Sequence, residues 1–173
     1  KGIADTFGAE IQDINIAANA LSKNLGVSFE EALTELSRGF ASGANISGDF
    51  LEQVKEYPST FQDAGLSAKQ FTDIIIAQSK AGIKDDFGID AIKEFNIKIK
   101  EQTAATKDAL TGAFGNEFTN EILKGVDTGA ITTVQALDKI AQKTKEVNLT
   151  QQQLQLLKVD VFGSKGEDIG LGF

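Results

Sequence analysis

Apolar residues recur at intervals of three and four along almost the whole chain of 173 residues, which places them on one face of an α-helix. Residues 7–25 carry the clearest stripe: Phe7, Ile11, Ile14, Ala18, Leu21 and Leu25. The pattern predicts an all-α fold. Beyond residues 7–25 we expect helices between Ser28 and Gly43, from Ser47 or Asp49 to Tyr57, around Phe61, between Ser67 and Gly82, from Asp85 or Asp86 past Ile99, and at about 104–114, 116–127, 132–147 and 150–162.

Start signals bound several of these helices. In a capping box, a hydroxyl side chain and a Glu or Gln three residues later satisfy the free amides at a helix start. We expect capping boxes at Ser28 with Glu31, at Ser67 with Gln70, and at Thr150 with Gln153. A further cap is expected at Thr132 or Thr133.

Stop signals bound the other ends. Glycines at 26, 43 and 82 are expected to end helices, because glycine readily adopts the left-handed conformation of a C-terminal cap. The chain has one proline, Pro58. We expect the helix before it to end at Tyr57, because a residue that precedes proline avoids the helical region.

These signals recur with a period of 38–39 residues, which predicts an internal repeat. Gly26-Val27-Ser28 aligns with Gly65-Leu66-Ser67, Gly43 aligns with Gly82, and residues 54–57 align with residues 92–95 after a one-residue deletion. Chance similarity between capped helices is the alternative. We expect an array of antiparallel helical hairpins, since a single hairpin cannot bury its own apolar stripe.

The repeat predicts four segments. Residues 1–25 form an N-terminal helix that continues from a parent chain, 26–64 the first repeat, 65–102 the second, and 103–173 a C-terminal helical segment. A degenerate third copy is suggested by Phe118-Thr119 and Gly129. The start at Lys1 and the lack of methionine lead us to expect a piece of a longer protein.

Composition narrows the functions open to the chain. Without cysteine or histidine it has no thiolate nucleophile, no usual zinc ligands and no Ser-His-Asp triad. Its net charge of −8 opposes binding to phosphate backbones. No apolar run is long enough to cross a membrane. We therefore expect no nucleic-acid or membrane contact through this segment, and no catalytic, cofactor-binding or metal-binding residues.

Three short stretches resemble ligand sites, and each has a plainer explanation. Asp85, Asp86 and Asp90 could suggest a calcium site, but residues 87 and 89 break the alternation of ligands and the helix start explains the charges. Residues 45–49 form an oxygen-rich loop that a turn and helix cap account for. Residues 163–166 contain Gly and Lys but do not match the P-loop spacing.

Other polar residues are expected to serve structure. Glu30, Glu31, Glu52 and Glu56 are predicted to lie on exposed helix faces, although paired carboxylates for glycoside hydrolysis stay open. Arg38, the single arginine, is expected to pair locally with Glu35 or Glu31. Residues 151–155 should form a surface helix, and Tyr57 should pack as its counterpart Phe95 does.

An ordered set of these stretches resembles bacteriophage tail tape measure proteins. The stretches are NLGVSFEEALTELSRGFASGANISGDFLEQVKEY (24–57), FQDAGLSAKQFTDIIIAQSKAG (61–82), DAIKEFNIKIKE (90–101) and LLKVDVFGSKGEDIG (156–170). In that family a Gly-Ser helix start leads to a Glu-aromatic pair, here Glu56-Tyr57, followed by a Gly-Leu-Ser helix and an Ala-Ile-Lys-Glu-Phe helix. The similarity covers roughly residues 20–170 and is weakest over residues 103–145.

The resemblance implies a structural role as a scaffold and length ruler in the phage tail. Its implied partners are tail tube subunits and tail assembly chaperones, and self-association is a further interaction that it allows. The virion tail is the implied location. Two alternatives stay open: a helical-repeat module that binds a partner helix, and a carboxylate-based cell-wall hydrolase.

Overall fold

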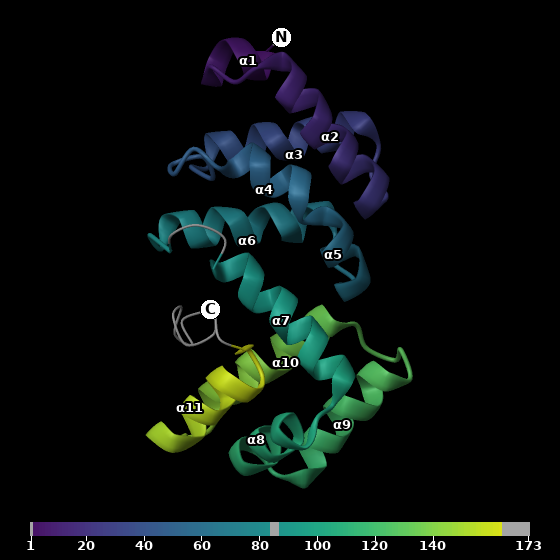
Figure 1. The fold of residues 1–173 in the computed structure, drawn as a ribbon, viewed down its shortest axis with the longest axis vertical. Helices are drawn as coiled ribbons and strands as arrows, with labels where there is room; N and C mark the ends of the chain where they lie inside the picture. Colours follow the sequence, from purple (N-terminus) through teal and green to yellow (C-terminus); the bar gives the residue numbers. More distant parts are fainter. Residues whose placement is uncertain (1, 84–86, 164–173) are drawn as a thin grey trace. The chain divides into compact units, whose positions relative to one another are not determined.

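The computed structural model describes residues 2–83 and 87–163, which form eleven helices and no strand (Figure 1). The prediction of an all-α fold is therefore confirmed. The chain divides into two compact units, residues 1–89 and residues 90–173. This boundary falls inside the predicted second repeat, residues 65–102, and the division into four segments stays a prediction.

The first unit contains six helices and the start of a seventh. They are α1 (Gly2–Phe7), α2 (Ile11–Leu25), α3 (Phe29–Ala41), α4 (Phe50–Glu56), α5 (Pro58–Ala64), α6 (Ala68–Lys80) and the first residues of α7 (Phe87–Glu101). Helix α2 packs against α3, α4 and α5, and α3 packs against α6. Figure 1 shows α1, α3 and α6 in successive layers of this unit.

Local capping explains where these helices begin. Both predicted capping boxes are present: the Ser28 hydroxyl accepts from the Glu31 amide at the start of α3, and Ser67 accepts from Gln70 at the start of α6. Each pair also bonds in reverse, from the amide of the serine to the side chain three residues on. Two of the four free amides of each helix are thereby satisfied.

The predicted glycine stops are confirmed as well. Gly26 ends α2 in the left-handed conformation, and Gly65, for which no stop was stated, ends α5 in the same way. Gly43 and Gly82 follow α3 and α6 with φ of +89° and +67°. In both places the next amide bonds back to the carbonyl five residues earlier, from Ala44 to Gly39 and from Ile83 to Gln78. The caps thus recur at an interval of 39 residues, while the repeat as a whole stays a prediction.

One predicted helix start and the reason given for one helix end were wrong. The helix expected at residues 7–25 begins at Ile11, because Gly8 adopts φ +70° and separates it from the short helix α1. As a result, Ile11 is half exposed rather than part of the core.

The second correction concerns Tyr57. The helix ends there, but the residue keeps a helical conformation (φ −92°, ψ −16°), so the stated reason was wrong. Pro58 occupies the first position of α5, where its missing amide costs nothing. The Tyr57 amide still bonds to the Gln53 carbonyl, as in a helix, so only Tyr57 separates the end of α4 from the start of α5.

Aromatic side chains link the surface of the first unit to its core. The Phe7 ring stacks on Phe40 with centroids 5.1 Å apart, and Phe40 meets the edge of Phe50 at 5.2 Å. Phe50 is fully buried against Gly39 of α3, where an added Cβ would lie 2.2 Å from the ring. Phe29, the first residue of α3, is 40% exposed.

The second unit comprises the rest of α7 with α8 (Ala104–Phe114), α9 (Asn116–Asp127), α10 (Thr133–Glu146) and α11 (Gln151–Asp160). These bounds lie within two residues of the predicted ones, and the capping boxes at Thr132 and Thr150 are present. Its core is a cluster of buried side chains drawn from all five helices: Phe95, Ile99, Ala109, Leu110, Ile122, Leu123, Ala136, Ile140, Leu157, Val161 and Phe162. The apolar residues Ile89, Ile92, Phe95 and Ile99 of α7 recur at helical spacing and are all buried.

Candidate functional site

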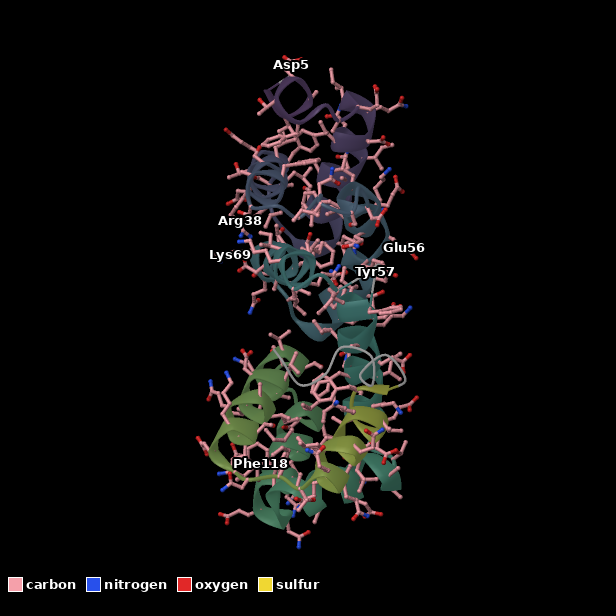
Figure 2. All side chains as sticks on the ribbon, turned by 90° about the vertical axis from the view of Figure 1, so that its left-hand side faces the viewer. Asp5, Arg38, Glu56, Tyr57, Lys69 and Phe118 are labelled. Atoms are coloured by element: carbon pink, nitrogen blue, oxygen red, sulfur yellow. The ribbon has the colours of Figure 1, made fainter. Side chains whose placement is uncertain are left out.

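A network around Arg38 joins α3 to α6. Its guanidinium donates to Glu35 one turn earlier at 2.6 and 2.9 Å, as predicted. It also donates to the Asp73 carboxylate and to the Lys69 carbonyl of α6, at 3.1 Å for the latter. Lys69 in turn bonds to Asp73 at 2.7 Å. Figure 2 shows Arg38 and Lys69 on one side of the first unit, away from Glu56 and Tyr57.

The network shifts the ionisation of its members. Partial burial of Asp73 opposes its ionisation, but hydrogen bonds and charge attraction from Lys69 and Arg38 outweigh that effect and lower its pKa. Burial likewise opposes the charge on Arg38, and its bonds to Glu35 and Asp73 raise the pKa overall. The cluster therefore holds fixed charges, as an interhelix clamp does, rather than a proton ready for transfer.

A second charged link joins α4 to α2. Lys55 donates to Glu52 on its own helix and to Asp13 of α2, at 3.0 Å for the latter. Hydrogen bonds to Glu52 and then Asp13 raise the Lys55 pKa. The amine is mostly covered, whereas both acids are more exposed. This link repeats, on the other pair of helices, the function of the Arg38 network.

A buried amide pair joins α4 to α6. The Gln78 side chain of α6 donates to Gln53 of α4 at 3.0 Å, and both residues are about 95% buried. Gly88 at the start of α7 leaves room for Gln78, since an added Cβ there would lie 2.6 Å from its side-chain oxygen. A buried amide hydrogen bond of this kind fixes how two helices align.

The carboxylates considered for hydrolysis lie on the surface. Glu30, Glu31, Glu52 and Glu56 are exposed, on α3 and α4. Hydrogen bonds from the Ser28 amide, and then from its hydroxyl, lower the Glu31 pKa. A general acid needs the opposite shift, so Glu31 acts as a helix cap. Tyr57 is buried, in agreement with the packing role predicted for it.

The three short stretches that resemble ligand sites lie partly within the described residues and partly outside them. In the loop before α4, the Asn45 side chain accepts from the Phe50 amide at 3.3 Å, which is turn chemistry. Gly163 lies against Glu94, whose carboxylate would repel a phosphate. Asp85, Asp86 and residues 164–166 lie outside the described residues. Across residues 2–83 and 87–163, no three acidic side chains are grouped so that they could hold a metal ion.

Two surface hollows among the described residues combine side chains from several helices and can be compared. One, of about 360 Å³, lies among α1, α2 and α3 and is lined chiefly by Ile3, Ala4, Ile11, Ile14 and Leu33. The other, of about 430 Å³, lies beside α8 and α9 and is polar, with Lys107, Lys124 and Asn120 in its lining. The first combines apolar side chains from three helices, which makes it the better candidate for binding a helix.

Two of these features were missed by the sequence analysis. Arg38 was expected to pair locally with Glu35 or Glu31, and its further partner Asp73 lies 35 residues away. The spacing of Lys69 and Asp73 on one face of α6 was the available signal. The apolar hollow depends on how α1, α2 and α3 pack together, which the periodicity of residues 7–25 does not encode.

No protein-family model, curated protein or solved structure matches this chain. Among the described helices, none is both long and apolar enough to cross a membrane.

Proposed function

We propose that this chain is a structural segment of a bacteriophage tail tape measure protein, which acts as a scaffold and length ruler during tail assembly. The observation that carries the proposal is the ordered set of sequence stretches that resembles that family. The helix starts and stops at the heart of that resemblance, Gly26 with Ser28 and Gly65 with Ser67, are real caps in the fold. Tail tube subunits and assembly chaperones are the proposed partners, and the virion tail is the proposed location.

The interactions between helices support the proposal of a passive spacer, because they bond one helix to another. Its charged groups clamp helix to helix, as in the links from Arg38 to Asp73 and from Lys55 to Asp13. The buried Gln53–Gln78 bond serves the same purpose. A ruler needs a fixed length per residue, and specific bonds between helices that pack side by side help to keep that length fixed.

Tail length measures this role directly. An in-frame deletion of residues 26–64 in the parent protein removes 39 residues and joins Leu25 to Gly65, which preserves the Gly-x-Ser junction. If these residues run as one helix in the tail, the tail should shorten by about 58 Å, at 1.5 Å per residue. If they stay stacked, the loss is one layer, about 8–10 Å.

Electron micrographs of several hundred tails resolve the first change, and averaged tail images resolve the second. Tails of unchanged length would refute the ruler. A matched control replaces residues 26–64 with residues 65–103 of the same chain, which keeps the length and should restore the original tail.

A second candidate is a helical-repeat module that binds a partner helix. The apolar hollow among α1, α2 and α3 favours it. In that case the deletion would leave tail length unchanged and abolish partner binding.

A further inference from the structure

The polar hollow of about 430 Å³ lies beside two neighbouring helices of the second unit, α8 and α9. Gly115 alone joins these helices, and they pack against each other (Figure 1). Gln102, just before α8, donates to the Leu123 carbonyl near the end of α9 at 3.0 Å. This bond holds the start of α8 beside the end of α9, so the two helices run in opposite directions along the hollow.

One wall of the hollow is a row of polar side chains on α9. Asn116, Asn120 and Lys124 all line it. Intervals of four residues place the three on one face of the helix, about 6 Å apart along its axis. Both asparagines are exposed, and neither side chain is hydrogen-bonded within the part of the chain that the structure describes. Their amide groups are therefore available to a ligand.

The spacing of this row matches an extended peptide. Two residues of an extended chain span about 6.6 Å, close to the 6 Å rise between successive members of the row. A side-chain amide has both donor and acceptor atoms, as a peptide unit does, so an asparagine can bond to a backbone N–H and a backbone C=O together. Asn116 and Asn120 can thus bond to alternate residues of one peptide that lies along α9.

Two lysines stand at one end of the hollow. Lys107 is in the first turn of α8 and Lys124 in the last turn of α9, so the antiparallel arrangement places them at the same end on opposite walls. Neither forms an ion pair with another described residue. Asp108 is the one carboxylate in the lining, and positive charge therefore exceeds negative charge here, although the whole chain carries −8.

We propose that this hollow binds an extended acidic segment of a partner protein, with two consecutive carboxylate residues at the lysine end. Successive side chains of an extended chain point to opposite sides, so one carboxylate meets Lys107 and the next meets Lys124. The neutral residues of the segment bond through their backbone to Asn120 and Asn116. This inference goes beyond the role in tail assembly and does not depend on it.

The asparagine row favours a peptide over a small anion. Two lysines alone suit a phosphate or a free carboxylate equally well. Asn116, however, is eight residues from Lys124, which is about 12 Å along the helix axis. A small anion held by the lysines leaves Asn116 without a partner, whereas a segment of about six extended residues reaches both ends of the row.

Titration of a short peptide into the ¹⁵N-labelled 173-residue chain tests the proposal. The probe is acetyl-Ser-Thr-Ser-Ser-Glu-Glu-amide, which carries two consecutive carboxylates and four neutral residues. It should shift the side-chain amide signals of Asn116 and Asn120 and the backbone amide signals of Lys107 and Lys124. Absence of shifts at millimolar peptide, or shifts centred on other residues, would overturn the proposal.

Two further ligands separate a peptide site from simple attraction of anions. The same peptide with both glutamates replaced by glutamine should bind about twofold to twentyfold more weakly, as expected for the loss of two exposed charge pairs. Inorganic phosphate at the same ionic strength should shift the signals of Lys107 and Lys124 but not the side-chain amide signal of Asn116. Equal binding of the two peptides, or the full set of shifts with phosphate, would contradict an acidic peptide site.

A charge variant with a matched control locates the carboxylates. Lys124→Gln should weaken binding of the acidic peptide by about two- to fivefold, since it removes one exposed charge pair. Lys145→Gln makes the same change at an exposed position on α10, outside the lining, and should leave the affinity nearly unchanged. Equal effects of the two variants would show that only the overall charge matters and would overturn the site.

Two more variants test the row and the one carboxylate of the lining. Asn120→Ala should weaken binding by about two- to tenfold through the loss of its hydrogen bonds, whereas Gln152→Ala, at an exposed position of α11, should have no effect. Asp108→Asn should strengthen binding, because it removes the repulsion of the peptide carboxylates. All three positions are exposed, so the variants should fold normally. Unchanged binding by Asn120→Ala, or weaker binding by Asp108→Asn, would contradict the proposed arrangement.

Discussion

The contact between α3 and α4 and the contact between α6 and α7 each place a glycine against a larger side chain. The glycine lies on the earlier helix in the first contact and on the later helix in the second. In the first, Gly39 on the earlier helix receives the Phe50 ring of the later one. In the second, Gln78 stands 39 residues after Gly39, and Gly88 stands 38 residues after Phe50. The small residue has moved from the earlier helix to the later helix.

The exchange shows what a close helix contact requires. Two helices approach closely when one side offers no Cβ and the other fills the space, and it matters little which side does which. The chemistry differs, however. The first contact is aromatic and apolar, whereas the second places a buried amide that also bonds to Gln53. Substitutions at these positions should therefore differ in size in a predictable order.

Removal of the Phe50 ring should have the largest effect. Phe50→Ala leaves a cavity against Gly39 and removes the edge contact with Phe40, so we expect a loss of about 3–5 kcal/mol in the free energy of unfolding. Urea denaturation measures it. A loss below 1 kcal/mol would mean that the neighbours collapse into the space and that the contact is not close-packed.

A methyl group added on the glycine side of this contact should destabilise the fold less than the loss of the ring does. Gly39→Ala places a methyl group 2.2 Å from a fully buried ring, which should destabilise by about 1–3 kcal/mol. Gly112→Ala is the matched control, since that α8 glycine has no neighbour within 4 Å and should gain about 0.5–1 kcal/mol in helix propensity. If Gly39→Ala and Gly112→Ala changed the free energy of unfolding in the same direction, the close contact between Gly39 and the Phe50 ring would be contradicted.

The amide contact should respond to polarity. Gln53→Leu removes the acceptor of the Gln78 side chain, and we expect a loss of about 1–3 kcal/mol. Gly88→Ala should cost less than Gly39→Ala, because the atom it meets first is the end of a flexible side chain. Thermal unfolding of Gln53→Leu, Gly88→Ala and Gly39→Ala gives the order of their losses in stability. A larger loss for Gly88→Ala than for Gly39→Ala would contradict the expected order.

The charged link between the same layers should have the smallest effect. Because the Asp73 pKa is lowered by folding, the unfolded chain binds more protons at low pH, so stability should fall as pH drops below about 4. Asp73→Asn should lose about 0.2–1 kcal/mol at pH 7, since the side chain is 43% exposed and solvent screens it. The free energy of unfolding should change less between pH 7 and pH 3 for Asp73→Asn than for Asp138→Asn. An equal change in both variants would show that Asp73 does not contribute to the pH dependence.

Local features were predictable and tertiary ones were not. Capping boxes at Ser28, Ser67 and Thr150 depend on residues three apart, so the sequence alone specifies them. The helix break at Gly8 was missed because a glycine inside a periodic stripe is only a weak signal. The reach of Arg38 to Asp73 depends on how α3 lies on α6, which no local pattern encodes. The hollow that defines the candidate site was missed for the same reason.

The spacing of partners along the chain has a mechanical consequence. In the first unit the main packing contacts join helices that are close in sequence, as α2 packs on α3, α4 and α5, and α3 on α6. Such short-range connectivity favours rapid folding and lets elements open one after another rather than all at once. A chain pulled from one end should then unravel helix by helix under modest force, and should re-form just as readily when the tension is released.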